Sequence, residues 1–182
     1  MGEELDASLL MPPPFARGLD RWSPADGDPA GPSLADGPGA FFLRRDEALG
    51  HCVELRLRRR VTSVRWMGET PLLAGRVLRL SVRARGQTGH AAVRLAGWAG
   101  GAGGRELTGQ PASGREVPLD ARRVRTAVAT VARSAPAPGL DMAWDQCAIF
   151  GHFGFDVLGE EGAIVRLDRL RVELLPRTEF RA

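Results

Sequence analysis

The chain has 182 residues, 43% of them hydrophobic and 26% charged, so it is long enough to bury a core without disulfide or metal staples. Its 25 basic residues are all arginine, but they exceed the 22 acids by only three and alternate with apolar residues, which argues against a nucleic-acid partner. No apolar run approaches the ~20 residues of a membrane span, which argues against membrane insertion.

Residues 1–40 are rich in proline, glycine and aspartate and show no sustained period of 3.6 or 2. We predict an irregular N-terminal arm over 1–40 and one globular domain over 41–182. The acids near the start, where a signal peptide has a basic segment, predict synthesis in the cytoplasm without a signal peptide. The arm's apolar residues suit docking on its own domain or on a neighbouring subunit, with a loose tail as the alternative; they are Leu9, Leu10, Met11, Phe15, Leu19 and Trp22.

From residue 41 onward, short runs of alternating apolar and polar residues are separated by glycine and proline. In RVLRLSVRAR (76–85), every second residue from Leu78 to Ala84 is apolar, whereas the residues between them are arginine or serine. This period of two is typical of a half-buried antiparallel strand. Similar runs predict strands over 41–44, 51–58, 61–66, 90–98, 115–119, 122–132, 147–157 and 163–175.

The last of these runs changes phase. Its apolar positions include Val165 and Leu167 and then resume at Leu170, a slip of one residue at Asp168 and Arg169 that predicts a β-bulge. Eight or nine short strands without a helix predict an all-β fold, an antiparallel β-sandwich or jelly roll. In that fold two sheets cover one core and leave their faces or end loops for binding.

Two cysteines, Cys52 and Cys147, lie in apolar surroundings, where a free thiol behaves as a small hydrophobe; a disulfide between them is the alternative. We expect no cofactor. A structural calcium between loops is a side alternative, because the acids and carbonyls of 141–161 offer oxygen ligands, although without EF-hand spacing.

The stretch IFGHFGFD (149–156) is the first candidate for chemistry. His152 shares a strand face with Phe150, Gly154 and Asp156, whereas the opposite face, which begins with Ile149, has the composition of a core. An imidazole, a ring, a flat glycine floor and a carboxylate side by side suit a ligand rich in hydroxyl groups. A histidine satisfied by its own neighbours is the alternative.

Tryptophan is the second candidate, because an exposed indole stacks on the apolar face of a sugar ring. The four tryptophans are Trp22, Trp66, Trp98 and Trp144, and we expect about two of them in the core or an interface. The glycine run 97–104 lacks the Lys-Ser/Thr ending of a nucleotide-binding loop. It predicts a flexible loop between strands, with Trp98 at its edge.

The sequence contains no catalytic motif. His51 and His90 lie in separate predicted strands and do not have the spacing of metal ligands. No serine or cysteine stands in a nucleophile elbow, and the acids are placed as solvated residues of turns and strand ends. We therefore predict a non-enzymatic protein, with a polysaccharide-degrading enzyme as the weaker alternative.

Three stretches taken together resemble a known family: RWMGETPLLAG (65–75), RLAGWAGGAGG (94–104) and LDMAWDQCAIFGHFGFDVLGEEGAIVRLDRLRVE (140–173). Their order and spacing are similar to the N-terminal module of β-helix spike proteins of the Rhodobacter group of alphaproteobacteria. That module also resembles the head spike fibre of gene transfer agents, which are phage-like particles. The resemblance covers most of residues 19–175 and implies a galactose-binding-like or carbohydrate-binding-module-like jelly roll.

The resemblance implies a spike outside a released particle that docks on a spike base or capsid protein and binds the capsular polysaccharide of a recipient cell. We expect a homo-oligomer, because linked sites raise avidity by ~10²–10⁴. A purely structural virion protein without glycan binding is the alternative. The sugar, the oligomeric number and the binding face stay open. The candidate carbohydrate-binding residues are Trp66, Arg94, Trp98, Trp144, Phe150, His152 and Asp156.

Overall fold

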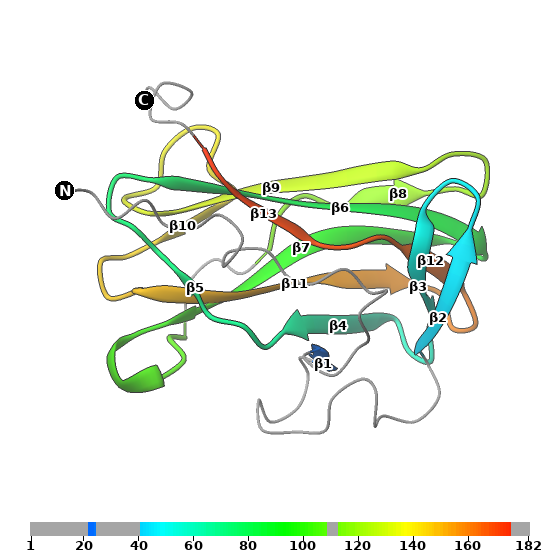
Figure 1. Ribbon diagram of the computed structural model, residues 1–182, viewed down its shortest axis with the longest axis horizontal. Helices are drawn as coiled ribbons and strands as arrows, with labels where there is room; N and C mark the ends of the chain where they lie inside the picture. The colour runs from blue at the N-terminus through cyan, green and yellow to red at the C-terminus, as the bar shows by residue number, and fades with distance from the viewer. Residues whose placement is uncertain (1–21, 25–40, 109–112, 176–182) are drawn as a thin grey trace.

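The computed structural model describes residues 22–24, 41–108 and 113–175, which form two β-sheets packed face to face around one core (Figure 1). Sheet 1 has the order β1 (Trp22–Pro24), β4 (Val61–Trp66), β11 (Phe150–Gly159), β7 (Ala91–Gly100) and β8 (Val117–Leu119), with β5 (Thr70–Pro71) also pairing with β11. Sheet 2 has the order β10 (Met142–Trp144), β9 (Arg125–Arg133), β6 (Val77–Thr88), β12 (Ile164–Leu167), β3 (Gly50–Arg56) and β2 (Phe41–Asp46), with β13 (Arg171–Leu174) also on β6.

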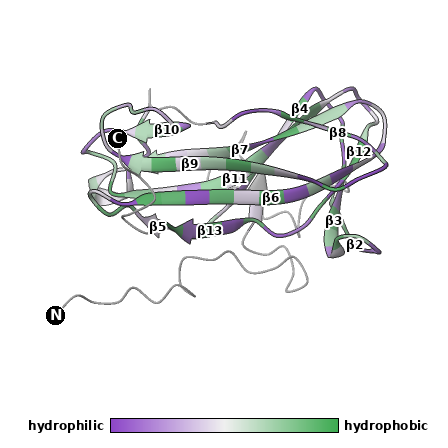
Figure 2. Cartoon of the chain, turned by 90° about the horizontal axis from the view of Figure 1, so that it is seen from above, coloured by the Kyte–Doolittle hydropathy of each residue, from purple (hydrophilic) through white to green (hydrophobic). Residues whose placement is uncertain are grey.

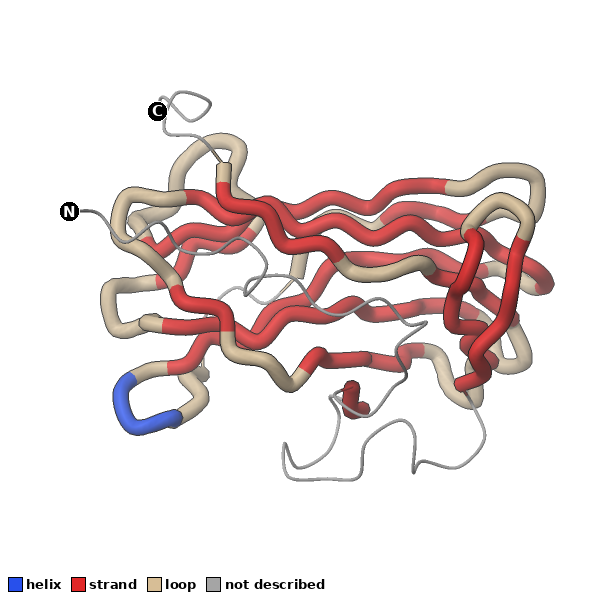
Figure 3. Tube along the Cα trace, viewed as in Figure 1, coloured by secondary structure: helices blue, strands red, loops and turns tan. Residues whose placement is uncertain are grey.

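All strand pairs are antiparallel except β9 with β10, which is parallel. The predicted all-β sandwich of the jelly-roll class is therefore confirmed. Figure 3 shows how completely strands dominate: the one helical segment among the described residues is the 3-10 turn η3 (Ala102–Gly104). The described part of the chain contains no helix long and apolar enough to span a membrane.

The alternation of apolar and polar residues builds the core. Along β6, Leu78, Leu80, Val82 and Ala84 are buried against sheet 1, and Figure 2 shows hydrophobic and hydrophilic segments alternating along this strand. Burying each large apolar side chain stabilises the fold by about 1.5–3 kcal/mol relative to leaving it in water. The pattern thereby fixes which side of each strand faces inward.

The phase slip of the last run is confirmed as a one-residue irregularity between β12 and β13. Leu167 of β12 lies opposite Ala84 of β6, and Arg171 of β13 lies opposite Ser81. Four steps along the last run thus match three along β6, which leaves one extra residue in the connection 168–170. Leu167 and Leu170 are both buried, so Asp168 and Arg169 are consecutive residues outside the core.

The glycine run does not form a loop from its beginning, as the sequence predicted. Residues 97–100 belong to β7, and the loop starts only at Gly101. A Cβ atom at Gly97 would lie 3.0 Å from the indole of Trp144, which stacks on Phe153 at 5.8 Å between ring centroids. Glycine is needed here because two core rings occupy the space of a side chain.

Trp22 belongs to the core of the sandwich. Its strand β1 pairs with β4, and its buried indole lies 6.0 Å from the ring of Phe155. Of the two predicted docking partners for Trp22, its own domain or a neighbouring subunit, the structure shows its own domain. The other predicted docking residues, Leu9, Leu10, Met11, Phe15 and Leu19, lie outside the described residues, and the domain boundary at residue 40 stays a prediction.

The outer face of sheet 2 carries a network of ion pairs. The buried carboxylate of Asp46 accepts hydrogen bonds from Arg85 and Arg166, both at 2.9 Å, and Glu54 accepts from Arg166 at 3.0 Å. Burial raises the pKa of both carboxyl groups, but hydrogen bonds, chiefly from Arg166, outweigh it and hold each pKa below its ordinary value. Both acids are therefore ionised at neutral pH and tie β2, β3, β6 and β12 together.

Cys52 is buried and Cys147 is exposed, and both thiols are free. Burial raises the pKa of the Cys52 thiol, and the nearby acid Asp46 raises it further. Across the described ranges, no three His, Cys, Asp or Glu side chains gather closely enough to hold a metal ion.

Candidate functional site

The candidate site lies on the outer face of sheet 1, where β11 runs between β4 and β7. In the antiparallel pairing of β11 with β7, His152 lies opposite Trp98, and Phe150 lies opposite Gly100. The strand ends and the loop after β7 enclose a depression of about 120 Å³, which we call the His152 depression. It is lined by Arg65, Ala99, Gly100, Gly104, Glu106, Phe150 and His152.

One wall of the depression is aromatic. The Phe150 ring covers Gly100, because a Cβ atom at that glycine would lie only 2.0 Å from the ring. The same ring meets the His152 imidazole edge to face, at 5.5 Å between centroids and an interplanar angle of 84°. Gly100 is thus the residue that lets Phe150 lie flat on β7 and hold the imidazole in place.

The opposite wall is charged. Arg65 of β4 is only 2% exposed, and its Nη1 donates a hydrogen bond to Glu106 Oε2 at 3.0 Å. Its guanidinium also lies 5.1 Å from the centre of the Trp98 ring, a cation–π distance. Arg65 therefore joins the acid on the loop to the indole on β7 beneath the depression.

His152 is neutral at pH 7. Burial lowers its pKa, and the positive charge of Arg65 lowers it further; together they outweigh the hydrogen bond to Gly68 and the nearby acids. Nδ1 lies 3.3 Å from the carbonyl oxygen of Gly68, and a carbonyl can only accept, so Nδ1 carries the proton. The half-buried imidazole then has Nε2 as an acceptor for a hydroxyl group.

Arg94 and Asp156 lie on the same face, further along β7 and β11, and contact each other. Arg94 Nε donates to Asp156 Oδ2 at 2.8 Å, and Arg94 Nη1 donates to Glu116 at 3.3 Å. Asp156 is buried, so its charge is neutralised within the protein. The pair braces the sheet beside the His152 depression and does not line it.

Two predicted tryptophans are not on the surface. Trp144 is fully buried against Phe153, and Trp66 is buried beside Gly68, where a Cβ atom would lie 2.1 Å from its ring. Both belong to the core, so the prediction that they contact a sugar is wrong for this pair. The structure keeps Trp98, Phe150 and His152 together at one place on the outer face.

The face of β11 that the sequence predicts in the core is buried except at its first residue. Ile149 is 41% exposed and precedes β11, so it is not in the core, whereas Phe153 and Phe155 are buried as predicted. Arg65 and Glu106 were missed. A signal for Arg65 exists, because it alternates with the apolar Val64 and Trp66 and so must face away from the core.

Comparison with known proteins identifies the fold. No protein-family model matches the chain, and no curated protein matches it closely. Among solved structures, it is similar to the C-terminal family 22 carbohydrate-binding module of Clostridium thermocellum Xyn10B: TM-score 0.56, 10% identity, 92% of this chain and 94% of that one. The chain has the β-sandwich fold of carbohydrate-binding modules.

Two further solved structures agree with this fold. The TmCBM61 module, solved with β-1,4-galactotriose, has a TM-score of 0.50 and 16% identity over 88% of this chain and 94% of that chain. An exo-β-agarase has a TM-score of 0.55 and 9% identity over 91% of this chain, which corresponds to only 25% of the agarase chain. The jelly roll is thus found both alone and as a part of larger enzymes.

Proposed function

We propose that this chain is a carbohydrate-binding module that holds a polysaccharide on the outer face of sheet 1 and catalyses no reaction. The observation that carries the proposal is the gathering of Phe150, His152, Arg65 and Glu106 around one depression in this fold. Trp98 adjoins it, opposite His152 in the sheet and 5.1 Å from Arg65. Solved structures with the same fold include one with bound β-1,4-galactotriose and one with bound xylohexaose, which supports a glycan as the ligand class.

The residues around the depression supply the two kinds of contact that a sugar needs. The rings of Phe150 and Trp98 offer apolar surface to the C–H groups of a pyranose. Nε2 of neutral His152 accepts a hydrogen bond from a hydroxyl group, and the Glu106 carboxylate, 47% exposed, accepts another. The 120 Å³ depression suits a short part of a chain lying across the face, not an enclosed ligand.

The charges of this face support binding without catalysis. Hydrolysis of a glycosidic bond needs two carboxyl groups facing each other, one of them protonated at working pH. Glu106 is paired with Arg65 at 3.0 Å and Asp156 with Arg94 at 2.8 Å, so each acid already has a cationic partner.

For the biological setting, we propose the head spike of a phage-like particle, with capsular polysaccharide of a recipient cell as the ligand. The support is the resemblance of the three sequence motifs to the head spike fibre family. In this proposal the chain acts outside a released particle, as a homo-oligomer docked on a spike base or capsid protein. Several weak copies on one particle would together give firm attachment.

The binding proposal is tested by electrophoresis of the purified protein through gels that contain a soluble polysaccharide, including galactan, xylan and capsule extract. We expect retardation by at least one of them. Trp98→Ala and His152→Ala should each raise the Kd for that polysaccharide about tenfold and so reduce the retardation, because a stacked ring or a hydrogen bond is worth ~1 kcal/mol or more. His51→Ala, an exposed histidine on sheet 2, is the matched control and should migrate like the wild type.

Full retardation of both variants would remove the His152 depression from the binding site.

The particle proposal has a separate test, in which particles with and without this chain are mixed with capsulated cells. We expect fewer particles to adsorb when the chain is missing. Equal adsorption would favour a purely structural virion protein.

A further inference from the structure

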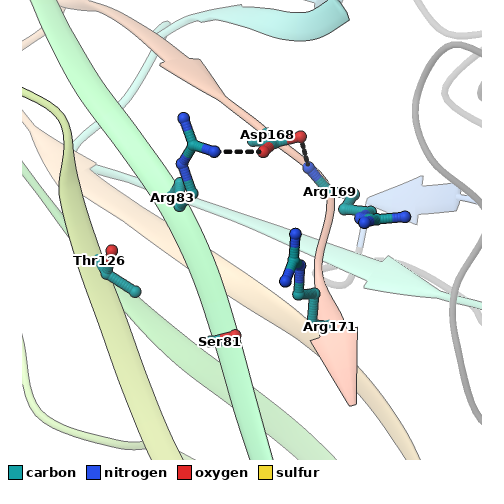
Figure 4. Close-up of a pocket in the computed structure, with 6 residues that line it drawn as sticks. All are labelled: Ser81, Arg83, Thr126, Asp168, Arg169 and Arg171. Carbon is teal, nitrogen blue, oxygen red and sulfur yellow. Dashed lines mark hydrogen bonds and ion pairs between the residues drawn. The ribbon is translucent and has the colours of Figure 1, made fainter. Parts of the chain in front are cut away.

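A second pocket lies on the other side of the molecule, on the outer face of sheet 2. It has a volume of about 240 Å³ and is lined by Ser81, Arg83, Thr126, Asp168, Arg169 and Arg171 (Figure 4). The extra residue of the connection between β12 and β13 creates it, because Asp168 and Arg169 lie there on the solvent side of the sheet. Irregular strands often re-aim side chains at binding sites.

The pocket has an excess of positive charge. Three arginines against one aspartate leave two positive charges among the residues that line it. Arg83 is fixed in place, because its Nη2 donates to the carbonyl of Ala48 at 2.7 Å and its Nη1 lies 3.5 Å from Asp168. Figure 4 shows the side chain of Arg171 extending toward this pair, whereas Arg169 turns away from it.

Arg171 differs from Arg79 and Arg85 on this face. Its neighbour Arg79 is held by Glu173 at 3.0 and 3.1 Å, and Arg85 is held by Asp46 at 2.9 Å. Within the described ranges, the guanidinium of Arg171 has neither a hydrogen bond nor an ion pair. The sheet therefore presents the guanidinium of Arg171 with its donors unused, next to that of Arg83, which is already oriented.

The floor of the pocket is small and polar. Ser81 lies opposite Arg171 in the ladder between β6 and β13, and Thr126 of β9 lies opposite Arg83. Their hydroxyl groups can donate and accept, and the Asp168 carboxylate can accept from a hydroxyl group of a ligand. None of the described residues that line this pocket is aromatic.

We propose that this pocket binds a sugar unit that carries one carboxylate or sulfate group, as found in acidic polysaccharides. Arg171 and Arg83 contact the anionic group, since a guanidinium presents paired donors that match two oxygens of an oxyanion. Ser81, Thr126 and Asp168 contact the hydroxyl groups of the same unit. The pocket is on the opposite sheet from the His152 depression, so this proposal stands independently of the one above.

A nucleic acid fits these residues less well. Single strands are held by aromatic platforms on which bases stack, and duplexes by many cations along the backbone. The pocket offers neither, and Asp168 opposes a closely charged phosphate chain. A hydroxylated ring with a single negative charge matches both the two surplus positive charges and the polar floor.

The test measures Kd by titration calorimetry with oligogalacturonate, a sulfated dextran, neutral galacto-oligosaccharide and a single-stranded oligonucleotide. We expect binding of an acidic glycan in 50 mM salt, with Arg171→Gln raising Kd at least about tenfold, since a charge-assisted hydrogen bond is lost. Arg58→Gln removes the same charge from an exposed turn and serves as the control. Binding should weaken as salt is raised, because exposed charges are screened.

The outcomes separate the possible sources of binding. Loss with Arg171→Gln but not with Arg58→Gln or His152→Ala supports the pocket. Inorganic sulfate competing as well as the acidic oligosaccharide would show that the sugar ring is not recognised and would overturn the glycan part. No acidic glycan bound, equal loss with Arg58→Gln, or tighter Arg171-dependent binding of the oligonucleotide would overturn the proposal. Circular dichroism of each variant confirms that the fold is kept.

Discussion

Sheet 2 carries buried ion pairs at Asp46 and an exposed ion pair between Arg79 and Glu173. The two kinds should contribute very different amounts to the free energy of unfolding. We expect Asp46→Asn to lower the free energy of unfolding by about 2–4 kcal/mol. Breaking a fully buried pair costs about 3–5 kcal/mol. Here the carboxylate is 1% exposed, but Arg85 and Arg166 are 23% and 24% exposed and water can solvate them in part.

The substitution keeps the volume and one acceptor oxygen of the side chain but removes its charge. In the native protein Oδ2 receives both arginines, and Oδ1 accepts from the backbone N–H groups of Ala48 and Leu49 at 2.9 and 3.2 Å. Asparagine can still serve the turn with its oxygen, but its amide group then faces two guanidinium groups. The decrease in the free energy of unfolding therefore reports mainly the loss of the two ion pairs and not the loss of the turn's hydrogen bonds.

Glu173→Gln is the matched control on the same face. Its partner Arg79 is also on β6, but the two side chains are 40% and 46% exposed, so the expected cost is about 0–1 kcal/mol. Urea unfolding followed by tryptophan fluorescence gives both values from the shift in midpoint at constant slope. Equal losses for the two variants, or less than about 1 kcal/mol for Asp46→Asn, would refute the reasoning from burial.

Three further predictions concern pH and the His152 depression. Asp46 and Glu54 each have a folded-state pKa below the unfolded value, so their stabilisation is present above about pH 5 and is lost as pH falls through the folded-state pKa values. The urea midpoint of the wild type should therefore fall between pH 7 and pH 3. In Asp46→Asn this fall should be smaller. Because the pKa of His152 lies below 6.5, glycan retardation should be constant from pH 7 to pH 8 and weaken only below pH 6.5; a loss between pH 8 and 7 would contradict a neutral imidazole. Gly100→Ala should displace the ring of Phe150 and reduce retardation about as much as His152→Ala, at a cost of about 1–3 kcal/mol in stability for the lost ring contacts and strained rotamer; unchanged retardation would show that the ring is not part of the site.

The fold could be predicted from the sequence wherever a strand has one solvent-exposed face and one buried face. Alternation along β6 shows the period and the inward phase together, and the slip near Asp168 is visible because the apolar phase shifts within a single run. Short strands carry no period. β1 has three residues and β5 two, and only pairing with distant strands defines them.

The candidate site was predicted in part, because the sequence shows the face of a strand but not what lies across from it. His152, Phe150 and Trp98 have the outward phase and meet on one face. Trp66 lies two residues after Val64 and shares its inward phase, which indicates the core. The prediction instead followed the residue type, because an indole can stack on a sugar. The pair of Arg65 and Glu106 joins residues 41 apart through a loop, which strand periodicity does not reveal.

The odd residue between β12 and β13 gives this stretch an unusual tolerance to length. Elsewhere in a strand, losing one residue turns every following apolar side chain from the core into solvent. Between Leu167 and Leu170, the loss of Arg169 would instead restore an unbroken pleat and leave Val172 and Leu174 facing the same way as before. Natural variants one residue shorter at this point could therefore keep the fold while changing the arrangement of cationic side chains on the surface of sheet 2.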